Sequence, residues 1–407
     1  MLSRTKKTLG PNKLALIALL ALSTLAILGC ASAPSRGWSG PLASDNVLYV
    51  GTIDGKVIAV DISAIPDGGA EVPLQWSPKD VGADTGGGGF LNCGRVSQPM
   101  AMYGTPVVAD GRLYVGTYDG SVLYIVIENG AMSDRFETGG SIVGSPVVDG
   151  ETLYVGSSDG KLYALSLDLG EKWSFKTGDK IWSDPGISDG VVYIGSADHK
   201  LYALDAETGR EIWHFEAGAA ILSTPVVFNG TVYIGSNDHR FYAIDTVTED
   251  EAIQAAAREE GQPALEKDAK AVFDGAGNWF WTKALAYNGE IWVGCLDHRV
   301  YVLDAVSLDK IREYDTEGMV YAPPVLLEGR IIVGSQDGNV YAINPEDRDA
   351  EPKVLYSFEA PILAPLYADI ENGIVYVHAQ NGEHVMYGLR VEPPEIVLSY
   401  RTDKLND

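Results

Sequence analysis

The chain has 407 residues, of which 46% are hydrophobic, and its formal net charge at pH 7 is −26. A hydrophobic fraction of this size supports a globular protein with a substantial core and excludes a largely disordered chain. The strong negative charge would repel nucleic acid and anionic lipid head groups. We therefore expect no nucleic-acid partner.

Residues 1–29 are typical of an export signal. Basic residues lie among residues 1–13 with no acid beside them, and an almost wholly apolar run follows from Leu14 to Leu28. A membrane-spanning helix needs about 20 apolar residues, whereas a run of about 7–15 suits the hydrophobic region of a secretory signal. We expect this segment to direct export and then to be removed.

The residues at the end of this signal resemble the lipobox of bacterial lipoproteins, because they read Ile27-Leu28-Gly29-Cys30. The resemblance implies cleavage before Cys30 and attachment of lipid, such as palmitate, to that cysteine. Residues 30–37 are small and polar and suit a flexible tether. We expect a protein anchored at the periplasmic face of the outer membrane where the cell has two membranes, and otherwise at the outer face of the cytoplasmic membrane. The alternative is an ordinary signal peptide with an incidental cysteine.

Residues 38–402 repeat one pattern eight times, most clearly from Ser145 to Leu165 (SPVVDGETLYVGSSDGKLYAL). Four features recur along the copies: a proline at a short strand, replaced by Ala284 in the sixth copy; an aromatic–aliphatic–Gly triplet, with substitutions in the last two copies; a segment that reads Tyr-Ala-Leu-Asp or nearly so after an Asp-Gly or Asp-His turn; and an aromatic residue on a last strand. Apolar segments joined by Asp-Gly turns indicate antiparallel hairpins. Four strands in about 40 residues form a blade of a β-propeller. The sequence therefore predicts an all-β, eight-bladed β-propeller of four-stranded antiparallel blades. We expect the ring to close without a strand shared between the termini.

Two insertions interrupt the repeats. Residues 79–102 lie between blades 1 and 2 and contain a run of four glycines, and residues 246–270 lie inside blade 5. We expect the second insertion to form a short, exposed, acidic helix ending near Gly261. Loops on a rigid scaffold often carry binding sites. The first insertion also contains Cys93, and export would permit a disulfide with Cys295; otherwise Cys295 is a small buried residue.

The repeat resembles the propeller repeat of pyrroloquinoline quinone (PQQ) proteins. Trp173 to Gly178 (WSFKTG) is followed by Ser-x-Pro, Val-Tyr-x-Gly-Ser and Leu-Tyr-Ala-Leu-Asp segments typical of that repeat. Many PQQ-dependent alcohol dehydrogenases hold the quinone against a disulfide between adjacent cysteines, but the three cysteines here, Cys30, Cys93 and Cys295, are not adjacent. No segment matches the catalytic or calcium-binding motifs of those enzymes. We therefore assign no catalytic residue, no metal site and no cofactor, although binding of PQQ stays open.

The lipobox, the short tether and a single propeller together resemble the BamB family of outer-membrane assembly lipoproteins. That resemblance implies a scaffold for protein–protein interactions among envelope proteins, including the machinery that assembles β-barrel proteins. The leading hypothesis is thus a lipid-anchored, non-enzymatic scaffold. The alternative is a sensor that binds PQQ or another small ligand, and a PQQ-dependent dehydrogenase ranks third.

Blades 4 to 6 carry histidine where other blades have a turn glycine, and a basic residue follows each histidine: His199-Lys200, His239-Arg240 and His298-Arg299. Histidine tolerates left-handed turn geometry, which favours a structural role. Equivalent turns in neighbouring blades stand on the order of 10 Å apart, whereas zinc ligands must come within about 2 Å of the metal. A metal site is therefore disfavoured. The basic residues make this sector a candidate partner surface.

A second candidate site lies three residues before each proline, near the entry of the innermost strands. The aromatic residues at this position are Trp38, Tyr103, Trp182, Trp281 and Tyr321. Asp184 directly precedes the recurring proline in its copy, and Lys283 directly precedes Ala284, which stands in place of the proline. We expect these residues to surround the mouth of the central channel, where aromatic side chains could stack on a ligand or hold an extended peptide. The alternative is packing between blades.

Overall fold

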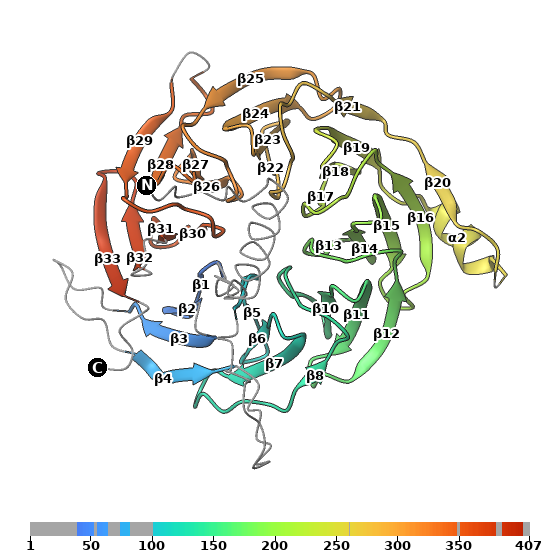
Figure 1. Cartoon of the computed structure of the whole chain (residues 1–407), viewed down its shortest axis with the longest axis horizontal. Helices are drawn as coiled ribbons and strands as arrows, with labels where there is room; N and C mark the ends of the chain where they lie inside the picture. The colour runs from blue at the N-terminus through green and yellow to red at the C-terminus, as the bar shows by residue number, and fades with distance from the viewer. Residues whose placement is uncertain are drawn as a thin grey trace, which may run out of the picture.

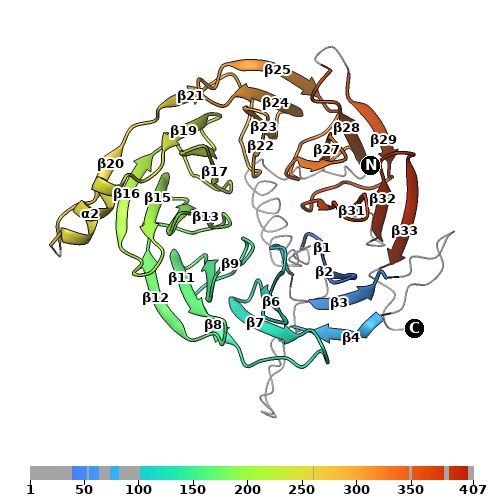
Figure 2. The ribbon, with the colours of Figure 1, turned by 180° about the vertical axis from the view of Figure 1, so that it is seen from behind.

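The computed structural model describes residues 39–52, 55–63, 74–81, 101–259, 261–347, 351–379 and 385–401. These residues form eight sheets arranged as the blades of a ring, and each blade has four strands that pair antiparallel (Figures 1 and 2). The predicted eight-bladed β-propeller is therefore confirmed. Within the described ranges, no helix is both long enough and apolar enough to cross a membrane.

The strands of each blade follow one another in space as they do in the chain. Blade 1 comprises β1 (Leu42–Ser44), β2 (Val47–Gly51), β3 (Lys56–Asp61) and β4 (Leu74–Asp80), and blade 2 comprises β5 (Val107–Ala109), β6 (Arg112–Gly116), β7 (Ser121–Val126) and β8 (Phe136–Glu137). Blade 3 comprises β9 (Val147–Asp149), β10 (Thr152–Gly156), β11 (Lys161–Ser166) and β12 (Glu171–Lys176), and blade 4 comprises β13 (Gly186–Ser188), β14 (Val191–Gly195), β15 (Lys200–Asp205) and β16 (Glu211–Glu216). Blade 5 comprises β17 (Val226–Phe228), β18 (Thr231–Gly235), β19 (Phe241–Asp245) and β21 (Ala271–Phe273), and blade 6 comprises β22 (Leu285–Tyr287), β23 (Glu290–Cys295), β24 (Arg299–Asp304) and β25 (Lys310–Asp315). Blade 7 comprises β26 (Val325–Leu327), β27 (Arg330–Gly334), β28 (Asn339–Ile343) and β29 (Lys353–Ser357), and blade 8 comprises β30 (Tyr367–Asp369), β31 (Ile374–Ala379), β32 (Val385–Arg390) and β33 (Glu395–Arg401).

The core lies between neighbouring blades. In blade 4, every residue of β14 is buried, because both faces of this strand pack against other blades. Tyr154 and Leu162 of blade 3, for example, share one cluster with Val192 and Ile194 of blade 4. Each blade can thus bury its faces only against its neighbours, as expected for a repeat protein.

The glycine of the aromatic–aliphatic–Gly triplet makes room for the connection that leads to the next blade. A Cβ atom added at Gly195 would lie 2.4 Å from Cγ2 of Ile221, and one added at Gly235 would lie 2.2 Å from Cβ of Phe280. Real Cβ atoms do not approach other atoms so closely. The repeated glycine is therefore a packing requirement and carries no functional information.

Blades 1 and 8 close the ring by packing face to face. Each has its own four strands, and Figures 1 and 2 show β1 and β2 beside β30 and β31. The hydroxyl of Tyr367 donates a hydrogen bond of 2.8 Å to the carbonyl oxygen of Ala43 across this junction. The predicted closure without a shared strand is confirmed.

The insertion inside blade 5 forms the expected short acidic helix and, in addition, a strand that was not expected. The helix α2 spans Glu249–Ala257 and so ends before Gly261. The chain then forms β20 (Leu265–Lys267), which pairs in parallel with β16 and gives blade 4 a fifth strand. Figure 1 shows α2 and β20 projecting from the rim. The ion pair of Lys267 with Glu251, 2.9 Å long, holds helix and strand together.

Candidate functional site

Most of the repeated polar residues belong to one hydrogen-bond pattern, which we call the interblade clasp. In blade 4, Oδ2 of Asp198 accepts hydrogen bonds from the Tyr202 hydroxyl at 2.7 Å and from the backbone N–H of Gly178 at 2.6 Å. Gly178 belongs to the connection from blade 3, so the aspartate joins two blades. The same pattern recurs as Asp159–Tyr163–Gly139, Asp238–Tyr242–Gly218, Asp297–Tyr301–Gly277 and Asp337–Tyr341–Glu317.

The clasp explains both the aspartate of the turn and the tyrosine of the Tyr-Ala-Leu-Asp segment. Burial, followed by the hydrogen bond to the Asp238 carboxylate, raises the pKa of Tyr242 to about 12. The neutral phenol is thus the form that the fold stabilises. These two residue types are scaffold in five blades and are not candidates for ligand binding.

The three turn histidines occupy left-handed backbone conformations. Their φ angles are 76° at His199, 70° at His239 and 73° at His298, which is the region where the other blades use glycine. No group of three or more His, Cys, Asp or Glu side chains in the described part of the chain is arranged to hold a metal ion. The geometry is that of a structural turn.

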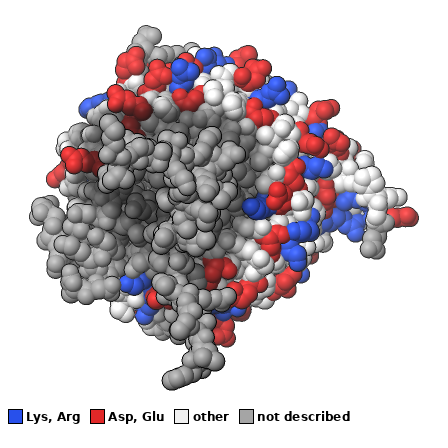
Figure 3. Space-filling view, viewed as in Figure 1, with Lys and Arg blue, Asp and Glu red and all other residues white. Residues whose placement is uncertain are grey.

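The basic residues beside these histidines are largely balanced by acids. Lys200 Nζ lies 3.9 Å from Glu216, and Arg299 Nε lies 2.9 Å from Asp315. On the face shown in Figure 3, positive and negative side chains lie side by side around the rim. Since exposed pairs of this kind contribute little to stability, the residues remain available to a partner.

The structure brings two of the predicted channel-mouth residues together. The rings of Trp182 in blade 4 and Trp281 in blade 6 lie 6.4 Å apart, although blade 5 stands between them. Leu222 occupies the same position in blade 5 and is 9% exposed. Lys180 lies over the Trp182 ring, with Nζ 5.4 Å from its centre. The two tryptophans therefore span the inner edge of three blades.

The other channel-mouth aromatics have separate partners. Tyr103 lies 5.2 Å from Tyr118, and the Tyr321 hydroxyl donates to Sδ of Met319 at 3.1 Å. Trp38 lies outside the described residues. The sequence analysis missed Trp279, which is 42% exposed and lies two residues before Trp281. An extra aromatic in the segment Asn278 to Lys283 (NWFWTK) was the signal that could have revealed it.

Asp184 and Lys283 differ in their surroundings. Oδ1 of Asp184 accepts a hydrogen bond of 2.6 Å from the backbone N–H of Ser145 in the preceding blade. Burial raises the pKa of Asp184, and the positive charge of Lys283 opposes this rise. Lys283 itself is exposed. Asp184 thus contributes to the contact between blades, whereas Lys283 can meet a partner.

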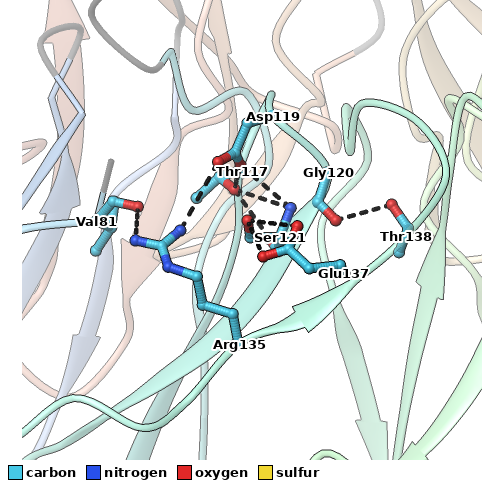
Figure 4. Close-up of polar contacts among 8 residues, drawn as sticks. All are labelled: Val81, Thr117, Asp119, Gly120, Ser121, Arg135, Glu137 and Thr138. Carbon is cyan, nitrogen blue, oxygen red and sulfur yellow. Dashed lines mark hydrogen bonds and ion pairs between the residues drawn. The ribbon is translucent and has the colours of Figure 1, made fainter. Parts of the chain in front are cut away.

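Blade 2 replaces the interblade clasp by an arginine bridge (Figure 4). Leu123 stands where the clasp tyrosine would be. Arg135 lies 3.8 Å from the Asp119 carboxylate and donates a hydrogen bond of 2.7 Å to the carbonyl oxygen of Val81 in blade 1. The hydroxyl of Ser121 beside them is fully buried and donates to Glu137, so it is not a nucleophile open to a substrate. This polar cluster joins blades 1 and 2 where the first insertion begins.

Cys295 is a buried free thiol. Its Sγ donates to the carbonyl oxygens of Asn278 and Trp279, both at 3.4 Å. Ser196 and Ser236 make the equivalent contacts in blades 4 and 5. Burial raises the pKa of the Cys295 thiol well above its usual range, which makes it unreactive. The other cysteines, Cys30 and Cys93, lie outside the described residues.

Comparison with known proteins defines the class of this propeller. Residues 93–172 and 168–286 match the family model described as outer membrane protein assembly factor BamB. No relative matches among curated proteins. The protein is a β-propeller of PQQ-type repeats that resembles BamB.

Three solved structures share the architecture. BamB from Moraxella catarrhalis aligns with a TM-score of 0.60 and 16% identity, over 83% of this chain and 90% of that one. The computationally designed Ika8 protein aligns with a TM-score of 0.65 and 14% identity, over 87% and 96%. The WD40 β-propeller domain of Doa1 aligns with a TM-score of 0.50 and 17% identity, over 67% and 87%. At these identities the likeness concerns the fold.

Proposed function

We propose that this propeller is a non-enzymatic, lipid-anchored scaffold outside the cytoplasm that binds other envelope proteins. Its most concrete form is a BamB-like role in the assembly of outer-membrane β-barrel proteins. The match to the BamB family model supports a scaffold for protein interactions. The export pattern and lipobox that end at Cys30 support the anchored location.

The observation that carries the proposal is a group of three tryptophans at the inner edge of blades 4 to 6: Trp182 and Trp281, whose rings lie 6.4 Å apart, and Trp279, two residues before Trp281 in the chain. We call it the tryptophan surface. Trp279 is 42% exposed, and Trp182 and Trp281 are partly buried and in contact. Tryptophan dominates the energetics of protein interfaces because it supplies a large area with little loss of side-chain entropy.

Two exposed lysines flank this surface. Lys180 lies over Trp182, and Lys283 follows Trp281 by two residues. On a protein with a net charge of −26, such a local concentration of positive charge favours an acidic and apolar partner segment. The partner surface thus combines aromatic area at its centre with charge at its edge, as protein interfaces do.

A capture experiment tests this role. The lipidated protein, cross-linked in cells and purified, is expected to recover components of the β-barrel assembly machinery. Trp182→Ala with Trp281→Ala is expected to abolish recovery, whereas Val306→Ala, at a side chain that is 72% exposed in blade 6, is the matched control. Recovery of no barrel-assembly component from a two-membraned host would contradict the BamB-like form.

The anchor is tested separately. Incorporation of a clickable palmitate analogue and sedimentation with membranes are expected for the unaltered chain and are expected to be lost in Cys30→Ser. A Cys30→Ser variant that still carries the label would refute lipidation at this residue.

A further inference from the structure

Among the eight sheets that the structure describes, only the sheet of blade 4 continues beyond a fourth strand. Its fifth strand, β20, pairs with β16 on one side, and no described strand lies on its other side. We call α2 and β20 together the rim arm, and Figures 1 and 2 show it at the outer rim of the ring. An open strand edge of this kind is a template on which another extended chain can pair.

The rim arm is held in place by contacts within the protein. Nζ of Lys267 in β20 lies 2.9 Å from the Glu251 carboxylate in α2. Nη1 of Arg210, just before β16, donates to the carbonyl oxygens of Ala255 and Ala256 at the end of α2, at 2.8 and 2.6 Å. These contacts fix β20 in an extended conformation, so pairing with it would require little further ordering of this chain.

A groove of about 420 Å³ lies between α2 and β20. Most of its lining is apolar and comes from Ile212, Ala255, Ala257, Pro263, Ala264 and Leu265. The two charged residues of the lining already have partners. Glu251 forms the ion pair with Lys267, and the side chain of Arg258 donates a hydrogen bond of 2.5 Å to a backbone carbonyl oxygen of β16. The groove therefore offers an apolar surface to an aliphatic side chain, directly beside the strand edge.

The side chains of β20 define the kind of strand that fits beside it. Leu265 lines the groove and is 47% exposed. Successive side chains of a strand point to opposite faces, so Lys267 lies on the same face as Leu265, and Glu266 lies on the other face and is exposed. Neighbouring side chains of opposite charge stabilise a strand pair, and like charges destabilise it. A matching strand therefore has an aliphatic residue beside Leu265 and a basic residue beside Glu266.

The charge around the rim arm also favours a basic partner. Its lysines are engaged within the protein, since Lys267 pairs with Glu251 and Lys270 pairs with Asp245 at 3.0 Å. Several acids on and around the arm are exposed and form no ion pair with another described residue: Glu249, Asp250, Glu259, Glu266 and Asp268. The same charges oppose pairing of β20 with β20 of a second copy of this chain.

We propose that β20 binds an extended segment of a partner protein in which aliphatic and basic residues alternate. The backbone of that segment pairs with the open side of β20, one aliphatic side chain packs beside Leu265 in the groove, and a Lys or Arg side chain contacts Glu266. This surface lies on the rim, apart from the tryptophan surface at the inner edge, and its use does not depend on the scaffold role proposed above.

Fluorescence anisotropy of a labelled peptide, titrated with the whole protein, tests the proposal. The probe is a capped heptapeptide of alternating valine and lysine, and it is expected to bind with a 1:1 stoichiometry. One control peptide has glutamate in place of lysine, and the other keeps lysine but carries a methyl group on every backbone nitrogen, so it cannot donate to a strand. Neither control is expected to bind. Equal binding of the probe and the methylated peptide, or no binding of the probe at millimolar concentration, would overturn the proposal.

Variants of the rim arm locate the surface. Glu266→Lys is expected to weaken binding of the lysine peptide severalfold and to strengthen that of the glutamate peptide, because the charge beside the added strand is reversed. Leu265→Ser is expected to weaken binding of the lysine peptide severalfold through the lost apolar contact. Glu171→Lys is the matched control, because Glu171 is an exposed acid on β12, the outermost strand of blade 3. If it weakens binding as much as Glu266→Lys, the attraction is general and the assignment to β20 is wrong.

Hydrogen exchange provides a second readout. The backbone amides of β20 are expected to exchange more slowly when the probe is bound, and those of β12 are expected to be unchanged. Binding without slower exchange in β20 would refute the strand pairing. Sedimentation of the free protein is expected to show a monomer, whereas a dimer that is lost in Leu265→Ser would identify the occupant as a second copy of this chain and contradict the proposed partner.

Discussion

The interblade clasp predicts a measurable loss of stability when a single hydroxyl is removed. In blade 4, Tyr202 is 7% exposed, and its hydroxyl donates to Asp198 at 2.7 Å. Tyr202→Phe keeps the ring and its contact with Phe175, whose ring centre lies 5.3 Å away. The variant therefore removes the hydrogen bond and little else.

The expected cost follows from what the carboxylate retains. A hydrogen bond to a charged group contributes about 1.5–3 kcal/mol. Asp198 keeps its bonds to the N–H groups of Gly178 and Lys200, at 2.6 and 3.0 Å, so the lower value applies. We expect Tyr202→Phe to lower the free energy of unfolding by about 1.5 kcal/mol.

Urea unfolding followed by tryptophan fluorescence measures this change through the midpoint and the slope. Tyr287→Phe is the matched control, because Tyr287 is partly exposed and surface substitutions usually change stability by less than about 0.5 kcal/mol. If Tyr202→Phe unfolds at the same urea concentration as the unaltered protein, the clasp does not stabilise the ring and the reasoning is wrong.

The remaining predictions concern other parts of the scaffold. The pKa of Tyr242 is raised to about 12 in the fold and is about 10 in an unfolded chain, so the contribution of this tyrosine to stability is complete below pH 10 and falls as the pH rises toward 12. The urea midpoint of Tyr242→Phe should therefore decline less between pH 8 and 11.5 than that of the unaltered protein. An equal decline would contradict the assignment. Gly235→Ala places a Cβ 2.2 Å from that of Phe280, so overpacking should lower the free energy of unfolding by about 1–3 kcal/mol. Gly261→Ala, which meets no atom within 4 Å but has a φ of 86°, should lower it by about 1 kcal/mol. Equal urea midpoints for Gly235→Ala and the unaltered protein would refute the packing argument. Cys295→Ser should change the free energy of unfolding by no more than about 1 kcal/mol, because serine makes the same contacts in blades 4 and 5. A large loss of stability would show that the thiol has another role.

The sequence was sufficient for the ring because the repeat is carried by residues with strict requirements. The clasp needs Asp and Tyr, the close approach between blades needs Gly, and a left-handed turn tolerates His199 in place of Gly. Each of these requirements recurs at a fixed spacing, so the alignment of copies gives the blade count and the mode of closure. Leu123, which stands where blades 3 to 7 have the clasp tyrosine, is likewise visible in the sequence as a departure from the repeat.

Other features could not be predicted from the residues that recur in the aligned repeats. β20 has three residues without an alternating pattern, and its partner β16 belongs to the preceding blade. The contact of Trp182 with Trp281 spans a whole blade, and a position in the repeat gives the place of a residue around the ring but not the direction of its side chain. These contacts arise from tertiary structure alone.

The central claim is that the tryptophan surface binds an envelope protein. A photoreactive phenylalanine analogue at position 279, where the side chain is 42% exposed, tests it most directly, with the same analogue at position 306, 72% exposed, as the control. Irradiation of cells is expected to yield a defined cross-linked envelope protein from position 279 and none from position 306. Cross-linking from neither position, or the same product from both, would contradict the account.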